Sequence, residues 1–386
     1  MATPAKKTQA EYSMKFTIER GELLRSLARL QSIVEKRNTI PILSNVKLEA
    51  DKDGLQLTVT DMDLVATEKV PAITTMHGSL TVPAGTFYDI VRKLPEGAQI
   101  ELEGISSSAQ LLVKSGSSKF ALSYLPAEDF PVMSEGDMTH NFSLPAQECL
   151  SLIEKSRFAM STEETRYYLN GVYLHVSESE DKGVMLKAVA TDGHRLARIE
   201  TALPAGATGM PGIIIPRKTV NELKKLIEEQ SEEVEISLSE TKIRFAFGNA
   251  VLLSKLVDGT FPDYARVIPD GNNKIMEVDA KLLNQAVDRV STISTGKTRG
   301  IKFALSAGKL NLSAQSPESG FAEEEIDVTY SADSFEIGFN SRYVLEMLAQ
   351  LEGDSAQFLF SDQNSPVLVT DPSDVRSLYV IMPMRV

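Results

Sequence analysis

The feature that most constrains the fold of this chain is a pattern that occurs three times. Phe16, Phe142 and Met276 each begin a short strand-like segment that runs directly into an amphipathic helical pattern. Four pairs of identical residues are separated by the same 131 positions: Asp61 and Asp192, Ser123 and Ser254, Phe130 and Phe261, and Pro131 and Pro262. Such a period is too long for a solenoid and fits whole domains. The sequence therefore predicts three successive copies of one domain.

The repeat also predicts where these domains lie. We expect the three copies at residues 14–137, 138–263 and 264–386. Residues 1–13 are small and polar and have no counterpart in the later copies, which is typical of a natural arm or an expression remnant. With 386 residues, of which 42% are hydrophobic and 24% charged, the chain has enough material for two or three compact cores.

Each copy contains two predicted helices, because apolar residues recur there at spacings of three and four. The first helices are expected at 20–37, 145–158 and 279–299, and the second at 84–94, 216–229 and 340–352. Apolar and polar residues alternate in 55–59 and 243–247, which is typical of half-buried antiparallel strands. Runs of strands with two helices per copy indicate an α+β fold in which both helices pack on one face of an antiparallel sheet.

Charge is divided unevenly between these elements. The six predicted helices together carry a net charge of +6, which leaves −19 for the rest of a chain whose total is −13. Domains that turn their helices to a common side would concentrate positive charge there, as contact with a phosphate backbone requires. The alternative is a set of ordinary solvated helix faces. The basic residues concerned are Arg20, Arg25, Arg29, Lys36, Arg37, Lys155, Arg157, Arg217, Lys218, Lys224, Lys225, Lys281, Arg289 and Arg342.

Composition argues against several functional classes. No apolar run approaches the ~20 residues that span a bilayer, and the first residues lack the apolar stretch of a secretory signal, so a cytoplasmic location is expected. The single cysteine, Cys149, falls on a helical pattern and is interpreted as an ordinary core thiol. The four histidines are scattered and offer no metal-ligand spacing. We therefore expect neither a metal nor another cofactor.

Two short motifs could suggest an enzyme. Gly296-Lys297-Thr298 resembles the end of a phosphate-binding loop, but Ser291 stands where that loop needs its first glycine, and a helix precedes it instead of a strand. Thr191-Asp192-Gly193-His194 places an acid and a base close together. Its counterpart in the first copy is Thr60-Asp61-Met62, so the Thr-Asp pair is interpreted as a turn whose Asp side chain bonds local backbone.

Five motifs follow one another along the chain: Met14-Lys15-Phe16-Thr17-Ile18-Glu19-Arg20, Arg166-Tyr167-Tyr168-Leu169-Asn170-Gly171, Thr191-Asp192-Gly193-His194-Arg195-Leu196-Ala197, Phe261-Pro262-Asp263-Tyr264 and Met382-Pro383-Met384-Arg385. Together they resemble the bacterial beta sliding clamps of DNA polymerase III, over nearly all of residues 14–386. The resemblance implies three DNA-clamp domains per subunit and a head-to-tail homodimer, a closed ring with the helices lining its hole.

The same resemblance implies a function. Such a protein is a non-catalytic processivity factor that encircles duplex DNA without reading its sequence. It is loaded by an ATP-dependent clamp loader. The replicative polymerase, the clamp loader, repair polymerases and mismatch-repair proteins bind it through short peptides, and no membrane is involved. A basic lining and an acidic exterior agree with the charge division.

The resemblance also assigns residues to three surfaces. DNA contact falls on Arg37, Tyr167, Tyr168, Arg217 and Lys218. The peptide cleft falls on Leu169, Thr191, Gly193, His194, Arg195, Leu196, Pro262, Val267, Val380, Met382, Pro383, Met384 and Arg385. The dimer contact falls on Phe120 and Leu122 on one side and Ile293 on the other.

Two departures and one competing hypothesis remain. Glu163 and Glu164 precede the Arg-Tyr-Tyr loop and weaken the attraction of that loop for phosphate. Pro366 stands at a position that is polar in better-known relatives, so the rim of the cleft is expected to differ here. The competing hypothesis is an enzyme that acts on DNA with Asp192 and His194 as acid–base residues; it predicts turnover that His194→Ala abolishes.

Overall fold

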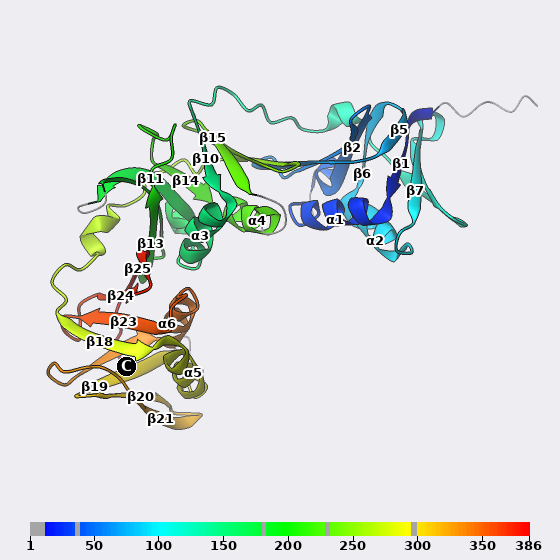
Figure 1. Cartoon of the computed structure of the whole chain (residues 1–386). Helices are drawn as coiled ribbons and strands as arrows, with labels where there is room; N and C mark the ends of the chain where they lie inside the picture. Colours follow the sequence, from blue (N-terminus) through cyan, green and yellow to red (C-terminus); the bar gives the residue numbers. More distant parts are fainter. Residues whose placement is uncertain (1–11, 35–38, 180–182, 228–231, 295–298) are drawn as a thin grey trace, which may run out of the picture. The chain divides into compact units, whose positions relative to one another are not determined.

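The computed structural model describes residues 12–34, 39–179, 183–227, 232–294 and 299–386. The chain forms two compact units (Figure 1). Unit 1 is Met1–Ala146 with Asn221–Lys255, and unit 2 is Gln147–Val220 with Leu256–Val386. Every strand pair between named strands is antiparallel in the described residues. The predicted α+β class with antiparallel sheets is therefore confirmed.

Unit 1 contains two sheets, of strand order β5-β1-β7-β8-β9 and β10-β15-β16-β17-β4-β3-β2-β6. Its strands are β1 (Tyr12–Glu19), β2 (Asn45–Asp51), β3 (Gly54–Thr60), β4 (Leu64–Val70), β5 (Ile73–Met76), β6 (Gly78–Pro83), β7 (Gln99–Ile105), β8 (Gln110–Ser115), β9 (Ser118–Ser123), β10 (His140–Pro145), β15 (Glu233–Leu238), β16 (Lys242–Phe247) and β17 (Ala250–Lys255). The alternation predicted at 55–59 and 243–247 is confirmed in β3 and β16.

Unit 2 also contains two sheets, of order β14-β11-β12-β13-β25-β24-β23-β18 and β21-β20-β19-β22. Its strands are β11 (Gly171–Ser179), β12 (Gly183–Thr191), β13 (Arg195–Ala202), β14 (Ile213–Pro216), β18 (Lys274–Asp279), β19 (Gly300–Ser306), β20 (Lys309–Ser316), β21 (Gly320–Asp327), β22 (Phe335–Asn340), β23 (Ser355–Phe360), β24 (Val367–Asp371) and β25 (Asp374–Ile381). Each eight-stranded sheet thus joins four strands of the middle sequence copy to four strands of a neighbouring copy.

Among the described residues, six α-helices lie where the periodicity predicts them: α1 (Arg20–Leu30), α2 (Ala84–Lys93), α3 (Ala146–Arg157), α4 (Arg217–Ile227), α5 (Ala280–Ser291) and α6 (Ser341–Leu348). Three begin at side-chain caps, in which Glu19, Asp279 and Asn340 accept a backbone N–H of the first turn. Within unit 1, α1 packs beside α2, and within unit 2, α5 packs beside α6 (Figure 1).

The structure corrects three details of the expected elements. Helix α1 ends at Leu30 instead of reaching residue 37, because the chain turns at 31–34. Strand β1 begins at Tyr12, two residues before the predicted start of the fold. Leu282 also belongs to the apolar spacing from which the helix at 279–299 is predicted, but it is exposed because its neighbour Leu283 occupies the buried direction. Neighbouring helix positions point about 100° apart, so only one of the two can face the core.

The remaining composition-based expectations concern single residues. Cys149 on α3 is buried, and burial raises the pKa of its thiol to about 12, as expected of an inert core thiol. In the described part of the chain, every helix is too short or too polar to span a bilayer. Residues 296–298, which carry the Gly-Lys-Thr motif, lie outside the described residues.

Candidate functional site

An apolar cluster in unit 2 brings together residues that are far apart in the sequence. Strand β13 pairs with β25 so that Leu196 lies opposite Val380. The buried cluster consists of Leu169, Val189, Leu196, Ile214, Phe261 and Val380. Partly buried side chains pack around it: Tyr168, Tyr173, Val257, Tyr264, Ile268, Leu368 and Leu378. Three of the predicted cleft residues, Leu169, Leu196 and Val380, therefore share one apolar surface.

An aromatic stack supports one side of this cluster. The Tyr173 ring stacks on Phe261 with 4.8 Å between centroids, and on His175 with 4.6 Å. The ring Nε2 of His175 lies 2.9 Å from the Tyr264 hydroxyl. Burial lowers the pKa of His175 to about 4 and raises that of Tyr264 to about 12, so both groups are neutral at pH 7. The stack therefore contributes packing and a neutral hydrogen bond to this side of the cluster.

The Thr191–Arg195 turn is built by its own side chains. Thr191 Oγ1 donates to the Arg195 carbonyl (2.7 Å) and accepts from the Gly193 N–H (3.1 Å). The Asp192 carboxylate accepts the backbone N–H groups of His194 and Arg195, at 2.9 and 3.0 Å. Gly193 has a φ of 88°, a conformation that suits glycine.

The first sequence copy contains the same turn. Thr60 Oγ1 donates to the Leu64 carbonyl and accepts from Met62 N–H, both at 3.0 Å. Asp61 accepts the N–H groups of Asp63 and Leu64. Met62 takes the glycine position with a φ of 81°, at a cost in strain. The interpretation of the Thr-Asp pair as a structural turn is therefore confirmed.

This geometry leaves Asp192 and His194 poorly suited to acid–base catalysis. Both Asp192 oxygens are occupied, one by backbone N–H groups and the other by Arg195 Nε at 3.1 Å. The His194 ring stacks on Tyr343 with 6.2 Å between centroids, and the hollow beside it is also lined by Arg342. No group of three or more potential metal ligands occurs among the residues that the structure describes.

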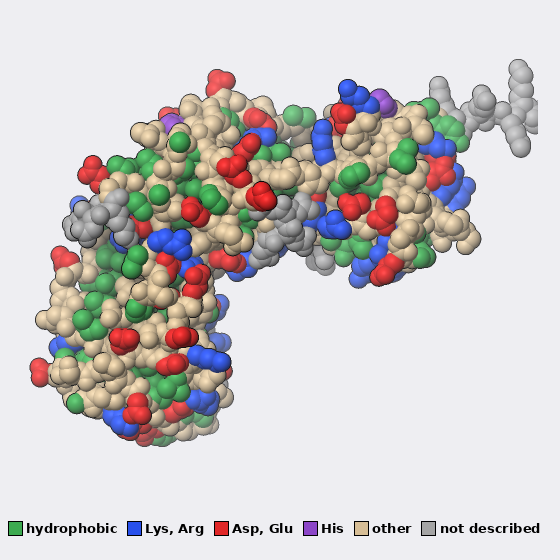
Figure 2. Space-filling view, in the orientation of Figure 1, with side chains coloured by type: hydrophobic (Ala, Val, Ile, Leu, Met, Phe, Trp, Pro, Cys, Tyr) green, Lys and Arg blue, Asp and Glu red, His purple; other side chains and the backbone are tan. Residues whose placement is uncertain are grey.

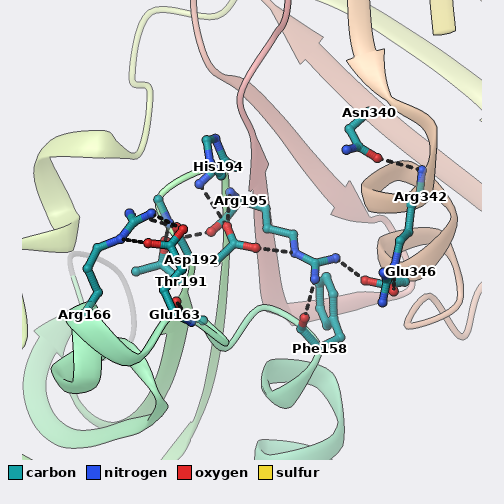
Figure 3. Close-up of polar contacts among 12 residues, drawn as sticks. Phe158, Glu163, Arg166, Thr191, Asp192, His194, Arg195, Asn340, Arg342 and Glu346 are labelled. Atoms are coloured by element: carbon teal, nitrogen blue, oxygen red, sulfur yellow. Dashed lines mark hydrogen bonds and ion pairs between the residues drawn. The ribbon is translucent and has the colours of Figure 1, made fainter. Parts of the chain in front are cut away.

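Arg195 is the centre of a buried network that connects β13 to α6 (Figure 3). Its guanidinium pairs with Asp192 and Glu346, and Nη2 donates to the Phe158 carbonyl at 2.6 Å. The guanidinium carbon also lies 4.4 Å from the Tyr343 ring centroid and 5.1 Å from that of Phe158. We call these residues the Arg195 network. Arg195 was expected to line the cleft, and the structure gives it a positioning role as well.

In the loop before β11, the positive charge of Arg166 is balanced by a neighbouring glutamate. Arg166 donates to both oxygens of Glu163, at 2.7 and 2.5 Å, and to the Asp192 carbonyl at 3.2 Å (Figure 3). The hydrogen bond from Arg166 lowers the pKa of Glu163, so this carboxylate is charged at neutral pH. Tyr167 is exposed, whereas Tyr168 packs against the apolar cluster. The two rings meet edge to face with 5.7 Å between centroids, and that of Tyr167 is the more exposed.

Residues 380–385 run alongside the Thr191–Arg195 turn. The Met382 N–H donates to the His194 carbonyl at 2.8 Å, and the Met384 N–H donates to the Gly338 carbonyl at 2.9 Å. Met382 and Arg385 are exposed, whereas Pro383 and Met384 are half-buried. Pro383, Met384 and Arg385 border a hollow of about 640 Å³. The carbonyl of Pro366 accepts a hydrogen bond from Asn272 (2.9 Å).

In the segment after β17, two residues predicted to line the cleft lie outside the apolar cluster, and two residues that were not predicted lie in it or against it. Pro262 and Val267 are exposed there, and the cluster does not include them. Phe261 and Tyr264 supply the packing instead. These two aromatic residues stand in the Phe-Pro-Asp-Tyr motif itself, so the sequence carried a signal for them. Val189, Ile214 and Tyr173 gave no such signal, because their strands have no distinctive motif.

The predicted basic surface needs correction at two residues. Arg29 forms an ion pair with the fully buried Glu68, and Lys155 pairs with buried Asp374 at 2.6 Å. Both cations are themselves largely buried, so they stabilise the interior and do not present charge to a ligand. Arg25 and Lys225 in unit 1 keep exposed side chains. Figure 2 shows basic and acidic side chains interspersed along the α1–α2 margin of that unit.

The other predicted contact residues fall on different elements. Arg217 and Lys218 begin α4 and are half-buried, and burial lowers the pKa of Arg217. Arg37 lies outside the described residues. Phe120 and Leu122 lie on β9, where Phe120 is exposed and Leu122 is buried. Ile293 is half-buried just after α5.

Comparison with known proteins agrees with the threefold repeat. Models of the DNA polymerase III beta subunit match three consecutive segments: its N-terminal domain at residues 14–134, its central domain at 143–263 and its C-terminal domain at 265–385. The chain belongs to the DNA polymerase III beta subunit family, the beta sliding clamps. Its role is that of a DNA sliding clamp, a non-catalytic accessory subunit, so neither family nor geometry supports the competing enzyme hypothesis.

Individual beta sliding clamps resemble the chain along its length. The beta sliding clamp of Caulobacter vibrioides is 49% identical over 97% of this chain and 100% of its own, and that of Escherichia coli K12 is 40% identical over 96% and 100%. The crystal structure of the Bartonella birtlesii clamp bound to griselimycin is 47% identical, with a TM-score of 0.93 over 97% of this chain and 100% of that one. The predicted membership of this family is confirmed.

Proposed function

We propose that two copies of this chain join head to tail into a ring around duplex DNA, and that each copy tethers replication and repair proteins through the cleft around the apolar cluster. An ATP-dependent clamp loader would open and close the ring. The observation that carries this proposal is the way in which sheets join inside the chain. Strands of different sequence copies pair edge to edge at two places inside the chain. The two strands that would form a third pairing of the same kind both lie at free sheet edges.

The two internal joins pair equivalent strands. In unit 1, β17 pairs with β4 so that Leu253 lies opposite Val65. In unit 2, β25 pairs with β13 so that Val380 lies opposite Leu196. In each pairing, the last strand of one sequence copy (β17 or β25) lies beside the third strand of a four-stranded group in another copy (β4 or β13). The strands of these two kinds that remain at sheet edges are β9 and β21.

The two remaining edges carry complementary side chains. Leu122 on β9 is the counterpart of Leu253, which follows it by 131 positions. Phe321 on β21 is the counterpart of Val65, because Phe321 lies three residues before Glu324 as Val65 lies three residues before Glu68. By this equivalence Leu122 would face Phe321 of a second copy. Phe321 is 59% exposed, an unusual state for phenylalanine on a strand. A heterologous contact of this kind generates a closed ring when its rotation closes.

An ion pair supports the same equivalence. Arg289 on α5 pairs with Glu324 on β21 at 2.5 Å, and Arg29 on α1 pairs with Glu68 on β4. The pair beside the completed join is buried, whereas Arg289 is 53% exposed beside the free edge. Pairing of β21 with β9 of a second copy would cover Arg289–Glu324 in the same way.

Phe321→Asp should therefore convert the dimer into monomers, because it places a charge at the centre of the joined edge. Sedimentation velocity at micromolar concentration measures the outcome. The matched control is Ile73→Asp, which changes an exposed apolar residue on β5, at the opposite edge of the sheet that contains β9. A dimeric Phe321→Asp variant, or a monomeric Ile73→Asp variant, would contradict the proposed join.

The DNA path is proposed to include Arg37, Tyr167, Tyr168, Arg217 and Lys218. Family membership supports this proposal, together with the placement of Arg217 and Lys218 in the first turn of α4. Tyr167 adds an exposed ring on the neighbouring loop. Contacts to phosphate without base contacts would let the ring slide on any sequence.

Arg217→Ala combined with Lys218→Ala should make the dependence of DNA affinity on salt shallower. Each lost phosphate contact reduces the slope of log K against log salt by about 0.9, so the pair should remove about 2. Fluorescence anisotropy on a short duplex measures the slope. Lys242→Ala with Arg244→Ala on β16 is the control, expected to keep it. An unchanged slope in the α4 variant would remove these residues from the DNA path.

The cleft is proposed to bind an extended peptide with apolar side chains from the polymerase, the clamp loader or repair proteins. The buried apolar cluster and the methionines at positions 382 and 384 support this proposal, because methionine adapts to different apolar side chains. The domain limits 14–137, 138–263 and 264–386 and the cytoplasmic location are proposed on the same family basis. Replication of a bacterial chromosome takes place in the cytoplasm.

A further inference from the structure

The 382–386 segment supplies much of the proposed cleft but has few fixed contacts of its own. Among the described residues, its two backbone hydrogen bonds are those from Met382 to His194 and from Met384 to Gly338. Hollows of about 640 and 290 Å³ lie on it, and both are bordered by Met384, Arg385 and Val386. Something other than dense packing must therefore hold the last part of this segment in place.

Two glycines on neighbouring strands make room for Val386. Gly300 is on β19 and Gly338 on β22, and these strands pair in adjacent register, with Gly300 opposite Asn340 and Gly338 opposite Lys302. A Cβ added at Gly300 would lie 2.7 Å from Val386 Cγ1. A Cβ added at Gly338 would overlap both Val386 Cγ2 and the Met384 carbonyl oxygen.

Backbone conformation does not explain these glycines. Neither has a positive φ, so an alanine could adopt either backbone conformation without strain. What both glycines supply is space. The side chain of Val386, which is 60% exposed, lies where a Cβ at either position would be, and at Gly338 the Met384 carbonyl oxygen lies there too. We call Gly300, Gly338 and the side chain of Val386 the glycine notch.

We propose that the glycine notch positions the 382–386 segment for peptide binding. Val386 in the notch and the Met384 N–H on Gly338 hold the end of the segment on β22, so that Met384 keeps its place on β22 and Met382 its place on the Thr191–Arg195 turn. Gly300, Gly338 and Val386 are positioning residues and do not contact the peptide. This inference rests on the proposed function of the cleft, and it identifies residues that control its shape from outside.

The test uses the full-length protein and a fluorescein-labelled peptide covering the clamp-binding segment of the cognate replicative polymerase. Gly300→Ala and Val386→Ala should each weaken peptide affinity about fivefold. The double variant should be no weaker than either single variant, because both changes remove the same contact. Gly85→Ala on α2, where a Cβ has nothing within 4 Å, is the control and should bind like the unchanged protein.

Hydrogen exchange of the Met384 amide gives a second readout that does not involve the peptide. Gly300→Ala should accelerate exchange of Met384 while leaving Phe303 and Phe339, in the core of the same sheet, unchanged. Unchanged Met384 exchange, or additive losses of affinity, would overturn the notch. Faster exchange at Phe303 and Phe339 as well would assign the glycines to sheet stability and also overturn it.

Failure of the cleft and failure of the notch give different results. If the unchanged protein does not bind the peptide, the proposed function of the cleft is wrong, and the exchange of Met384 still decides whether the notch holds the segment. If the unchanged protein binds and all the variants bind equally well, the cleft stands and the notch is overturned. Gly338→Ala provides a further check. Adding Val386→Ala should not restore the peptide affinity of Gly338→Ala, because the Cβ at position 338 also meets the Met384 carbonyl oxygen.

Discussion

Arg195→Ala should destabilise the sheet that contains β13 and β25 by about 2–3 kcal/mol, because Asp192 loses its buried cation and Glu346 keeps only Arg342. Native-state hydrogen exchange measures this as the opening free energy of amides in β13 and β25. Amides of β2 and β3, in unit 1, are an internal reference and should keep their values. The control Arg266→Ala removes an ion pair whose arginine is 83% exposed, and it should cost less than about 1 kcal/mol.

The stability of the same variant should depend less on pH than that of the unchanged protein. Burial acts to raise the pKa of Glu346, but hydrogen bonds from Arg342 and Arg195 outweigh it, and the pKa lies below its ordinary value of 4.5. A carboxylate with a lowered pKa in the folded state contributes stability above its unfolded pKa, and that contribution is lost as the pH falls through the folded value. The difference between wild type and Arg195→Ala should therefore narrow below about pH 4.5. A constant difference would show that Glu346 is not the group that Arg195 stabilises.

Peptide affinity should fall together with stability in this variant. Arg195 fixes the turn whose His194 carbonyl accepts the Met382 N–H, and its guanidinium lies against the Tyr343 ring. Loss of the guanidinium should therefore loosen both the Thr191–Arg195 turn and the contact with Tyr343 on α6. Arg195→Ala with unchanged stability and unchanged affinity would contradict the assignment of this residue as the centre of the network.

Much of the fold was predictable from sequence because local patterns carry it. The helix positions follow from apolar spacing, and the Thr-Asp turn follows from side chains that bond their own backbone, as Thr60 and Thr191 both do. The α+β class follows from the order of these elements. What local patterns do not contain is the pairing of β17 with β4 and of β25 with β13, which connects residues far apart in the chain.

The site was less predictable for the same reason. A count of basic residues on helices cannot distinguish Arg25, which is exposed, from Arg29, which a long-range contact with Glu68 buries. The cleft residues taken from the family resemblance include Arg195, whose main contacts are internal, and omit Phe261, whose ring lies in the cluster. Partners that come from other strands decide each of these cases, and no spacing rule reports them.

The largest expected effect of the ring is topological retention on DNA. A closed ring slides off a free end but cannot leave a closed circle, even though its contacts with phosphate are identical on both. Replacing the helix charges would change how fast the ring slides, whereas opening the DNA changes whether it stays. Phe321→Asp, which should prevent ring closure, serves as the negative control, and Ile73→Asp should behave like the unchanged protein.

The most direct measurement is therefore retention of labelled protein on a nicked circular plasmid during gel filtration, after loading with the clamp loader and ATP, before and after the plasmid is linearised. We expect the protein to travel with the circle, to be lost on linearisation, and to be kept when both linear ends are blocked by bound streptavidin. Equal retention on circular and unblocked linear DNA would contradict this expectation, because an ordinary binding face makes no distinction between them.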